Sequence, residues 1–300
     1  MSKIIILSNA DIDYHKWDKV VLNASNSRVY AETWYLDIIC PNWSGLIYGD
    51  YDFIMPIVSA KKMGIRYIYQ PTYAQQHGIF PPANTEILAQ FIGKIKDKYL
   101  YINTALNASC GAIENTIDVQ LRKNFTVSLN DSIENLVSNY NSHAKRYVRK
   151  ANKACTVVRN VSLEDFVTLK MLTSDKKNNQ LIQSKLKPLI SGAIQNQRGK
   201  IYGVYNENDQ LLAAAFFVTE KKRFTYLNSV SSDKGKKIRA MYAIINTFIH
   251  DHAKQQMLLD FEGSDIDGIA RFFMGFGAKL ETYQNIKYNN LPWYLKLLKR

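Results

Sequence analysis

Cysteine is scarce in this sequence, and the three cysteines form no pattern. Cys40, Cys110 and Cys155 lie far apart, are odd in number and include no CxxC pair. They predict neither a disulfide framework nor a zinc site, and a cysteine nucleophile is disfavoured because none has a basic partner nearby in the sequence. His250 and His252 are two residues apart, so they do not share one face of a helix. The sequence therefore predicts no metal site.

Long apolar runs are also missing. The longest, 211–218, is far shorter than the roughly 20 residues that a membrane-spanning helix needs. The first residues, MSKIIILSNADID, contain one lysine and four consecutive strongly apolar residues. That is too few for the apolar core of a signal peptide, and the segment predicts a first strand instead. We therefore expect no transmembrane segment and a cytoplasmic location.

Acidic residues are few relative to basic ones. Lys and Arg number 39 against 26 Asp and Glu, which gives a formal net charge of +13 and a pI near 9.4. A chain this basic suits a polyanionic partner, such as a nucleic acid, an anionic membrane surface or a phosphate-rich cofactor, although many basic proteins bind none. The 300 residues suffice for two domains of about 150 residues each. A content of 46% hydrophobic and 12% aromatic residues argues against disorder.

One stretch, 258–283, combines a strand, an acidic turn, a short helix and a second strand: LLDFEGSDIDGIARFFMGFGAKLETY. Its apolar start predicts a buried strand, and Asp260 and Glu262 stand at the end of that strand beside a glycine. Apolar residues recur at helical spacing over 266–274, and the following glycines lead into a strand at 278–283. Carboxylates at a strand end can be held partly desolvated, which suits a general base.

The segment DFEGS, followed by FGA and a tyrosine-bearing last strand, resembles the C-terminal half of the FemAB-like branch of the GNAT acyltransferase superfamily. In that branch, two acetyltransferase-like domains are fused in one chain. Carboxylate–Gly–Ser turns also close many strands that have no catalytic role. The resemblance implies an α/β (α+β) fold of tandem GNAT-like (acyl-CoA N-acyltransferase-like) domains, with mixed sheets flanked by helices. Residues 1–130 would form the first domain, and 131–300 the second, which would carry the donor site.

A helix start in the second half predicts an anion site. Three strands are expected there, at 200–205, 211–219 and 224–230. The strand that contains the apolar run 211–218 would be the central one. The segment SSDKGKKIRAM then leads into a helix at 238–253, so that backbone N–H groups and the helix dipole point at this start. The resemblance places the pyrophosphate of acyl-CoA here, although the glycine pattern is degenerate, and several FemAB-like proteins use aminoacyl-tRNA as the donor instead. The expected donor-binding residues are Gly235, Lys236, Lys237, Arg239 and Ala240.

A basic helix opens the second half. The helix is expected at 132–154, and its end, HAKRYVRKANKA, places cations on neighbouring turns. This arrangement resembles the helix that opens the second domain of FemAB-like proteins. It favours contact with phosphates of tRNA or of a nucleotide donor, and the alternative is a solvated helix face. The candidate polyanion contacts are Arg146, Arg149, Lys150 and Lys153.

Two segments of the first half favour an acceptor site. Aromatic residues and a carboxylate crowd a predicted helix at 28–39. The segment 66–80 ends in a polar loop that resembles a Tyr/Gln/Gly stretch of FemAB-like proteins. Core packing is the alternative for the helix, and His77 of the loop is either a base or a hydrogen-bonding residue. The expected acceptor-binding residues are Tyr30, Trp34, Asp37, Tyr73, Gln75 and Gln76.

The resemblance implies an N-acyltransferase or aminoacyltransferase that moves an acyl group to an amine-bearing small molecule or peptide in a cleft between the domains. Glu262 or Asp260 would be the base, Tyr283 the acid, and backbone N–H groups of a bulged strand at 224–230 the oxyanion donors. Acyl-CoA or aminoacyl-tRNA would be the donor, with no tightly bound cofactor. An evident long helical hairpin for tRNA contact is absent from the sequence, unlike in family members that act on peptidoglycan precursors. The alternative is a non-catalytic GNAT-like module that binds a nucleic acid or another polyanion.

The last ten residues, LPWYLKLLKR, combine aromatic and leucine side chains with cations. This tail either packs as a last element or touches an anionic surface.

Overall fold

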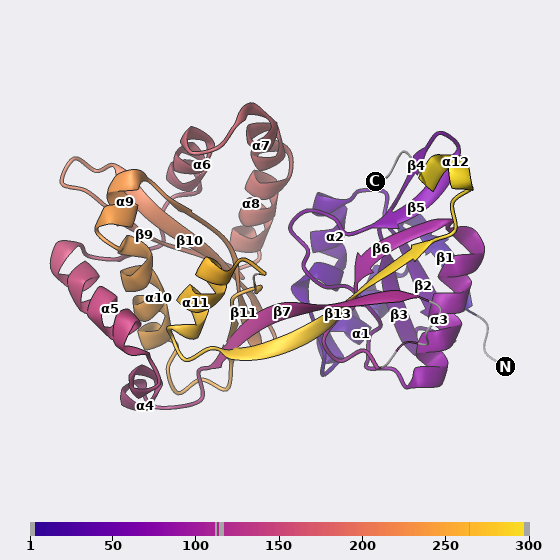
Figure 1. The fold of residues 1–300 in the computed structure, drawn as a ribbon, viewed down its shortest axis with the longest axis horizontal. Coiled ribbons are helices and arrows are strands. Elements are labelled where there is room, and N and C mark those ends of the chain that lie inside the picture. The colour runs from indigo at the N-terminus through magenta and orange to yellow at the C-terminus, as the bar shows by residue number, and fades with distance from the viewer. Residues whose placement is uncertain (1–3, 112, 114–116, 264, 297–300) are drawn as a thin grey trace. The chain divides into compact units, whose positions relative to one another are not determined.

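The computed structural model describes residues 4–111, 113, 117–263 and 265–296 (Figure 1). The chain forms two compact units: unit 1 comprises Met1–Arg122 and Thr282–Arg300, and unit 2 comprises Lys123–Glu281. It passes from unit 1 to unit 2 within β7 (Asp118–Ser128) and returns within β13 (Lys279–Asn289). From the sequence, we expected the second domain to comprise all of 131–300. The segment from Thr282 onward belongs to unit 1 instead, because β13 pairs with a strand of that unit.

Unit 1 contains two groups of strands. The strands β1 (Ile4–Ser8), β2 (Ser44–Tyr48) and β3 (Phe53–Ile57) form an antiparallel sheet. The second group runs in the order β4 (Ser59–Lys62), β5 (Ile65–Tyr69), β6 (Tyr101–Ala105) and the unit 1 part of β13. In it, β5 and β6 are parallel and the other pairs are antiparallel.

Helices cover the strands of unit 1 (Figure 1). They are η1 (Asn9–Asp11), α1 (Tyr14–Asn23), η2 (Val29–Ala31), α2 (Thr33–Ile39), α3 (Thr85–Lys98) and α12 (Trp293–Lys296). Asn84 caps α3 by accepting a hydrogen bond from the Ile87 N–H. The apolar face of α3, which includes Phe91 and Ile95, packs in one buried cluster with Ile68 and Ile102 of the strands.

Unit 2 is built around one mixed sheet. Its strands run in the order β7, β12 (Leu258–Asp260), β11 (Arg223–Ser231), β10 (Leu211–Glu220), β9 (Gly199–Tyr205) and β8 (Val158–Arg159). Among the described residues of this sheet, β11 and β12 pair in parallel and the other neighbouring strands are antiparallel. The interior position of β10 agrees with its almost unbroken apolar sequence, because both of its faces are covered.

Helices flank both faces of this sheet (Figure 1). They are α4 (Ile133–Ser138), α5 (Ser142–Ala154), α6 (Leu163–Leu172), α7 (Lys176–Leu181), η3 (Ile182–Leu186), α8 (Lys187–Gln195), α9 (Asp233–Lys237), α10 (Ala240–Asp251) and α11 (Asp267–Met274). On one face, Phe248 of α10 stacks on Phe217 of β10 with ring centroids 3.7 Å apart. The predicted mixed sheet flanked by helices is confirmed.

One predicted helix is divided in the structure, and another begins later than expected. The helix expected at 132–154 is α4 and α5, because Asn141 caps a new helix by accepting from the Ala144 N–H. The helix expected at 238–253 is preceded by the short α9, and Arg239 lies between α9 and α10 with φ of 64°. A left-handed residue ends one helix and lets the next begin in a new direction. No helix in the described ranges is long and apolar enough to cross a membrane.

Candidate active site

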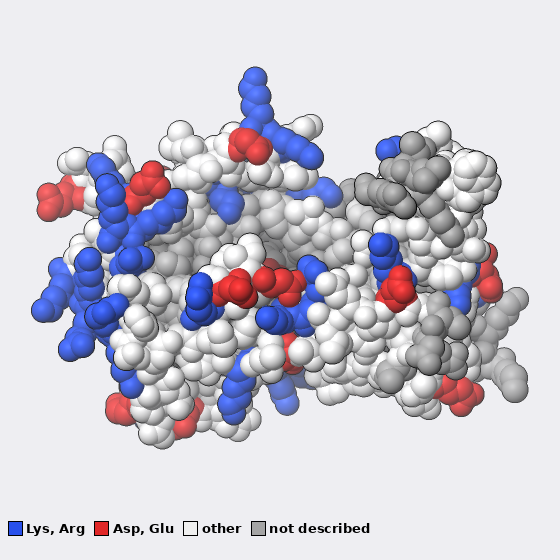
Figure 2. Space-filling view, viewed as in Figure 1, with Lys and Arg blue, Asp and Glu red and all other residues white. Residues whose placement is uncertain are grey.

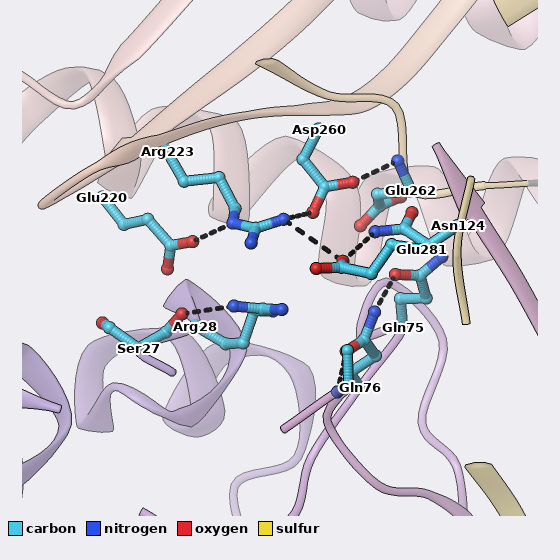
Figure 3. A network of polar contacts seen from close by, with 11 residues as sticks. Ser27, Arg28, Gln75, Gln76, Asn124, Glu220, Arg223, Asp260, Glu262 and Glu281 are labelled. Carbon is cyan, nitrogen blue, oxygen red and sulfur yellow. Dashed lines mark hydrogen bonds and ion pairs between the residues drawn. The ribbon is translucent and has the colours of Figure 1, made fainter. Parts of the chain in front are cut away.

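The end of β12 carries a buried carboxylate. Asp260 is 1% exposed, and Arg223 donates from its Nη1 to the Asp260 Oδ2 (Figure 3). The other oxygen of Asp260, Oδ1, accepts from the backbone N–H of Glu262 at 2.8 Å. Both carboxylate oxygens are therefore engaged inside unit 2, and Asp260 is placed to hold structure rather than to accept a proton from a substrate.

Arg223 is the centre of this cluster. It begins β11 opposite Leu258 of β12, and two further carboxylates flank its guanidinium. The Glu220 Oε1 lies 3.6 Å from the Arg223 Nε, and the Glu281 Oε2 lies 3.7 Å from the Arg223 Nη1. Burial lowers the pKa of Arg223, but the three carboxylates outweigh burial and raise it. The side chain of Arg223 is 10% exposed and therefore holds a positive charge inside the unit.

Glu281 brings the last strand of unit 2 into the cluster. Asn124, on β7 and fully buried, donates from its Nδ2 to the Glu281 Oε2 at 2.9 Å. The Glu281 side chain is 31% exposed, which is far more than those of Asp260 and Glu220. The sequence did not predict this cluster, although Asp260 was a candidate base. Glu220 lies three positions before Arg223, but Asp260, Glu281 and Asn124 are distant from it in the sequence, so no local pattern joins them.

A turn after β12 carries Glu262 away from Asp260. Glu262 and Gly263 have φ of 58° and 64°, in the left-handed region. A Cβ added to Gly263 would lie 2.0 Å from the Lys123 backbone oxygen, so only glycine fits. Glu262 is partly exposed whereas Asp260 is buried. The structure thus separates the two candidate bases, and Ser264 of the same segment lies outside the described residues.

β11, the strand expected to supply oxyanion donors, is bulged. Its register with β10 shifts so that Phe216 pairs with Asn228 and Phe217 with Tyr226, which leaves Leu227 as the extra residue. Its parallel pairing with β12 ends at Thr225. In the described part of the chain, the rest of β11 has a strand neighbour on the β10 side only. On its other side, the backbone of this part makes no ladder hydrogen bonds with a described strand.

A partly buried lysine lies near this bulge and was not anticipated. Lys170 of α6 donates from its Nζ to the Ser229 backbone oxygen at 2.7 Å, and burial lowers its pKa.

The expected donor segment forms a helix rather than an open loop. Ser232 caps α9 by accepting from the Gly235 N–H at 3.1 Å. A Cβ on Gly235 would lie 2.4 Å from the Leu212 backbone oxygen, so close packing on β10 accounts for this glycine. Lys236 is exposed and pairs with Asp233 at 3.0 Å. Lys237 is exposed, and Ala240 is buried at the start of α10.

Exposed cations from the expected donor-binding residues and from the expected polyanion contacts form one surface. The guanidinium groups of Arg146 and Arg239 lie 5.0 Å and 4.6 Å, respectively, from the ring centroid of Tyr147 of α5. This joins α5 to the α9–α10 junction. Figure 2 shows Lys and Arg gathered over this part of unit 2, at the left of the view. We call this surface the basic face; its exposed members are Arg146, Arg149, Lys150, Lys153, Lys236, Lys237 and Arg239.

Three of the expected acceptor residues make interior contacts in unit 1. Tyr30 is 1% exposed. The Asp37 Oδ1 accepts from the Tyr14 hydroxyl at 3.0 Å and from the Trp43 Nε1 at 2.7 Å. Gln76 is fully buried, and its Oε1 accepts from the Ala108 N–H at 3.0 Å. These contacts give the three residues structural roles.

The other three acceptor residues, Trp34, Tyr73 and Gln75, are partly exposed and stay predictions. His77 is 1% exposed, and burial lowers its pKa to about 4, which does not suit a base near neutral pH. Tyr283, the expected acid, is 9% exposed in the unit 1 part of β13. Among the residues that the structure describes, no group of three or more His, Cys, Asp or Glu side chains is arranged to hold a metal.

No protein-family model and no curated protein matches the sequence. Solved structures do match over nearly the whole chain. A crystal structure of FemX superposes with a TM-score of 0.66 at 12% identity, covering 99% of this chain and 100% of FemX. A conserved protein of unknown function from Bacteroides thetaiotaomicron gives 0.60 at 10% identity, covering 96% and 99%. L-PGS from Bacillus licheniformis gives 0.52 at 10% identity, covering 95% and 94%.

Proposed function

From the FemAB-like, GNAT-type fold that the chain has, we propose that the protein transfers an activated acyl or aminoacyl group to an amine. The observation that carries the proposal is the position of Glu262, a partly exposed glutamate just beyond the end of β12. The last residue of β12, Asp260, still pairs with β11. Transfer of an acyl group to an amine needs a base beside an oxyanion site. We assign the base to the DFEGS segment and the oxyanion donors to the bulged strand.

Each group has one task in the proposed reaction. Glu262 accepts a proton from the amine while the amine nitrogen attacks the acyl carbon and forms a C–N bond. Backbone N–H groups of β11 around Leu227 stabilise the oxyanion of the tetrahedral intermediate. The bond between the acyl carbon and its carrier then breaks, and the leaving oxygen or sulfur takes a proton, for which Tyr283 stays the proposed acid.

Asp260 and Arg223 act in this proposal as positioning residues. Asp260 accepts from the Glu262 N–H and is itself fixed by Arg223. Glu262 therefore leaves the sheet in one defined conformation, which reduces the conformational entropy lost when the reacting groups come together.

The basic face favours aminoacyl-tRNA over acyl-CoA as the donor. The Gly235 N–H is satisfied by Ser232, and close packing rather than phosphate approach accounts for the glycine. The exposed cations extend along α5 and the α9–α10 junction, which suits a long polyanion better than one pyrophosphate.

A binding and transfer experiment tests the proposal. The full chain would be titrated with a mixed aminoacyl-tRNA pool and, separately, with acetyl-CoA, and transfer of labelled aminoacyl groups to small amines would be followed. We expect tRNA binding that weakens steeply with salt and weakens further in R149Q/K150Q/K153Q. We expect E262Q to keep binding but to lose transfer at least about a hundredfold, whereas E207Q, at an exposed glutamate between β9 and β10, keeps both.

The outcomes separate the alternatives. Saturable binding of acetyl-CoA without tRNA binding would make acyl-CoA the proposed donor in place of aminoacyl-tRNA. Binding of tRNA with no transfer to any amine, unaffected by E262Q, would contradict the enzyme proposal and favour the non-catalytic polyanion-binding module, for which the basic face alone suffices.

A further inference from the structure

One end of unit 1 exposes large apolar side chains. Trp293 and Met63 are each 76% exposed and Tyr294 is 55% exposed, whereas Trp17 and Trp43 of the same unit are fully buried. Exposed tryptophan and methionine at this level are unusual unless the surface binds a partner. We call this region the tail surface; it consists of Met63, Trp293, Tyr294, Lys61, Lys62 and Arg66.

The tail surface is contiguous because α12 lies beside the turn between β4 and β5 (Figure 1). Leu291 and Leu295 line one pocket of about 240 Å³ together with Lys62, Met63 and Ile65. Leu291 and Leu295 are four residues apart and so share one side of the segment. This side packs against unit 1, and Trp293 and Tyr294 extend from the rest of α12 into solvent.

The turn between β4 and β5 has a methionine at a position where the backbone conformation disfavours it. Met63 and Gly64 have φ of 49° and 80°, and they join Lys62 to Ile65, which pair with each other in the hairpin. Such a two-residue turn strongly favours Asn or Asp at its first position. Methionine there is both strained and exposed, so neither local conformation nor core packing accounts for it.

The two segments that carry these apolar residues have charges of one sign only. The sequence segments 59–69 and 282–300 contain no Asp or Glu and seven Lys or Arg. Lys61, Lys62 and Arg66 are exposed in the hairpin beside Met63. Exposed tryptophan and tyrosine among cations, without acids, match the interface of an anionic bilayer, where the aromatic rings lie at headgroup depth and the cations meet lipid phosphates.

We propose that the tail surface docks unit 1 onto an anionic lipid bilayer. The basic face of unit 2 differs in the feature that matters: the ring of its aromatic residue, Tyr147, has Arg146 and Arg239 stacked against it. The tail surface presents aromatic and apolar atoms directly. The inference is independent of acyl transfer, since it uses no residue of the proposed reaction.

Vesicle sedimentation with the full chain tests this inference. The probes are vesicles of phosphatidylcholine alone and vesicles of equal parts phosphatidylcholine and phosphatidylglycerol. We expect binding to the anionic vesicles only, with a blue shift of tryptophan fluorescence that W293F abolishes. Binding should fall roughly a hundredfold in K61Q/K62Q/R66Q, at about fivefold for each cation removed, and at least tenfold in W293A/M63N.

The charge-matched control removes the same number of cations from α5, in R149Q/K150Q/K153Q, and should change vesicle binding less than about threefold. All four variants change exposed residues, and circular dichroism checks their folding. Equal losses from both triple variants, or a larger loss from the α5 variant, would overturn the inference. So would a fluorescence shift of Trp293 that depends on protein concentration without lipid, because the tail surface would then join two copies of the chain.

Discussion

Replacing Arg223 by methionine tests whether the buried ion cluster holds unit 2 together. Methionine keeps most of the length of the side chain but removes the charge. The side chains of Asp260 and Glu220 are each 2% exposed and that of Arg223 is 10% exposed, so the carboxylates would lose their cation where water does not replace it. Breaking a buried pair by removing one partner costs about 3–5 kcal/mol. We expect R223M to lose stability in this range.

Urea unfolding of unit 2, followed by a probe in that unit, measures the loss. A buried carboxylate without its cation favours its protonated form. The folded variant then binds more protons than the unfolded chain, so its stability falls as pH rises. The deficit of R223M relative to the unchanged protein should therefore be smaller at about pH 5 than at about pH 8.

A neutral version of the cluster provides the control. The triple variant E220Q/R223M/D260N removes the cation together with its two most buried partners and should recover most of the loss, because no buried charge is left uncompensated. A loss below about 1 kcal/mol in R223M, the same loss at both pH values, or no recovery in the triple variant would refute the reasoning.

Three further predictions concern single positions. Burial lowers the pKa of His77 to about 4, so His77 is protonated in the unfolded chain before it is protonated in the folded protein as pH falls. The free energy of unfolding should therefore decline by about 3 kcal/mol from about pH 6.5 to about pH 4. The melting temperature should fall accordingly, and H77Q should lack this fall. G263A should cost more than about 2 kcal/mol and reduce transfer, because its Cβ meets the Lys123 backbone and φ is positive; unchanged thermal unfolding would contradict this. G93A, at an exposed position inside α3 with open space around it, should instead stabilise unit 1 by about 0.5–1 kcal/mol in the same assay.

Local patterns in the sequence predicted elements better than they predicted their junctions. Apolar runs and helical spacing sufficed for β10 and α11, because burial on a sheet or helix face imposes those periods. They did not reveal the break at Arg239, because a left-handed arginine carries no sequence signal comparable to glycine. The fold class came from the resemblance of the DFEGS segment, and periodicity alone would not have supplied it.

The candidate site was predicted in part for a related reason. Asp260 and Glu262 were singled out because they stand at the end of an apolar strand, but the contacts that distinguish them depend partly on Arg223, which lies outside the segment. Asn124 and Glu281 are separated by 157 positions and meet only through the sheet. A sequence pattern carries no trace of such a pair, since neither residue is unusual in its own strand.

The two crossings of the chain, in β7 and β13, determine the order in which the units can be completed during synthesis. Unit 2 is one continuous segment, Lys123–Glu281, and every strand of its sheet has emerged before the last segment of the chain is made. Unit 1 must wait for Thr282–Arg300, which supplies the partner of β6. Domains usually fold in the order of synthesis, but here the later unit can finish first. Until β13 has been made, β6 keeps an open edge of the kind that promotes aggregation.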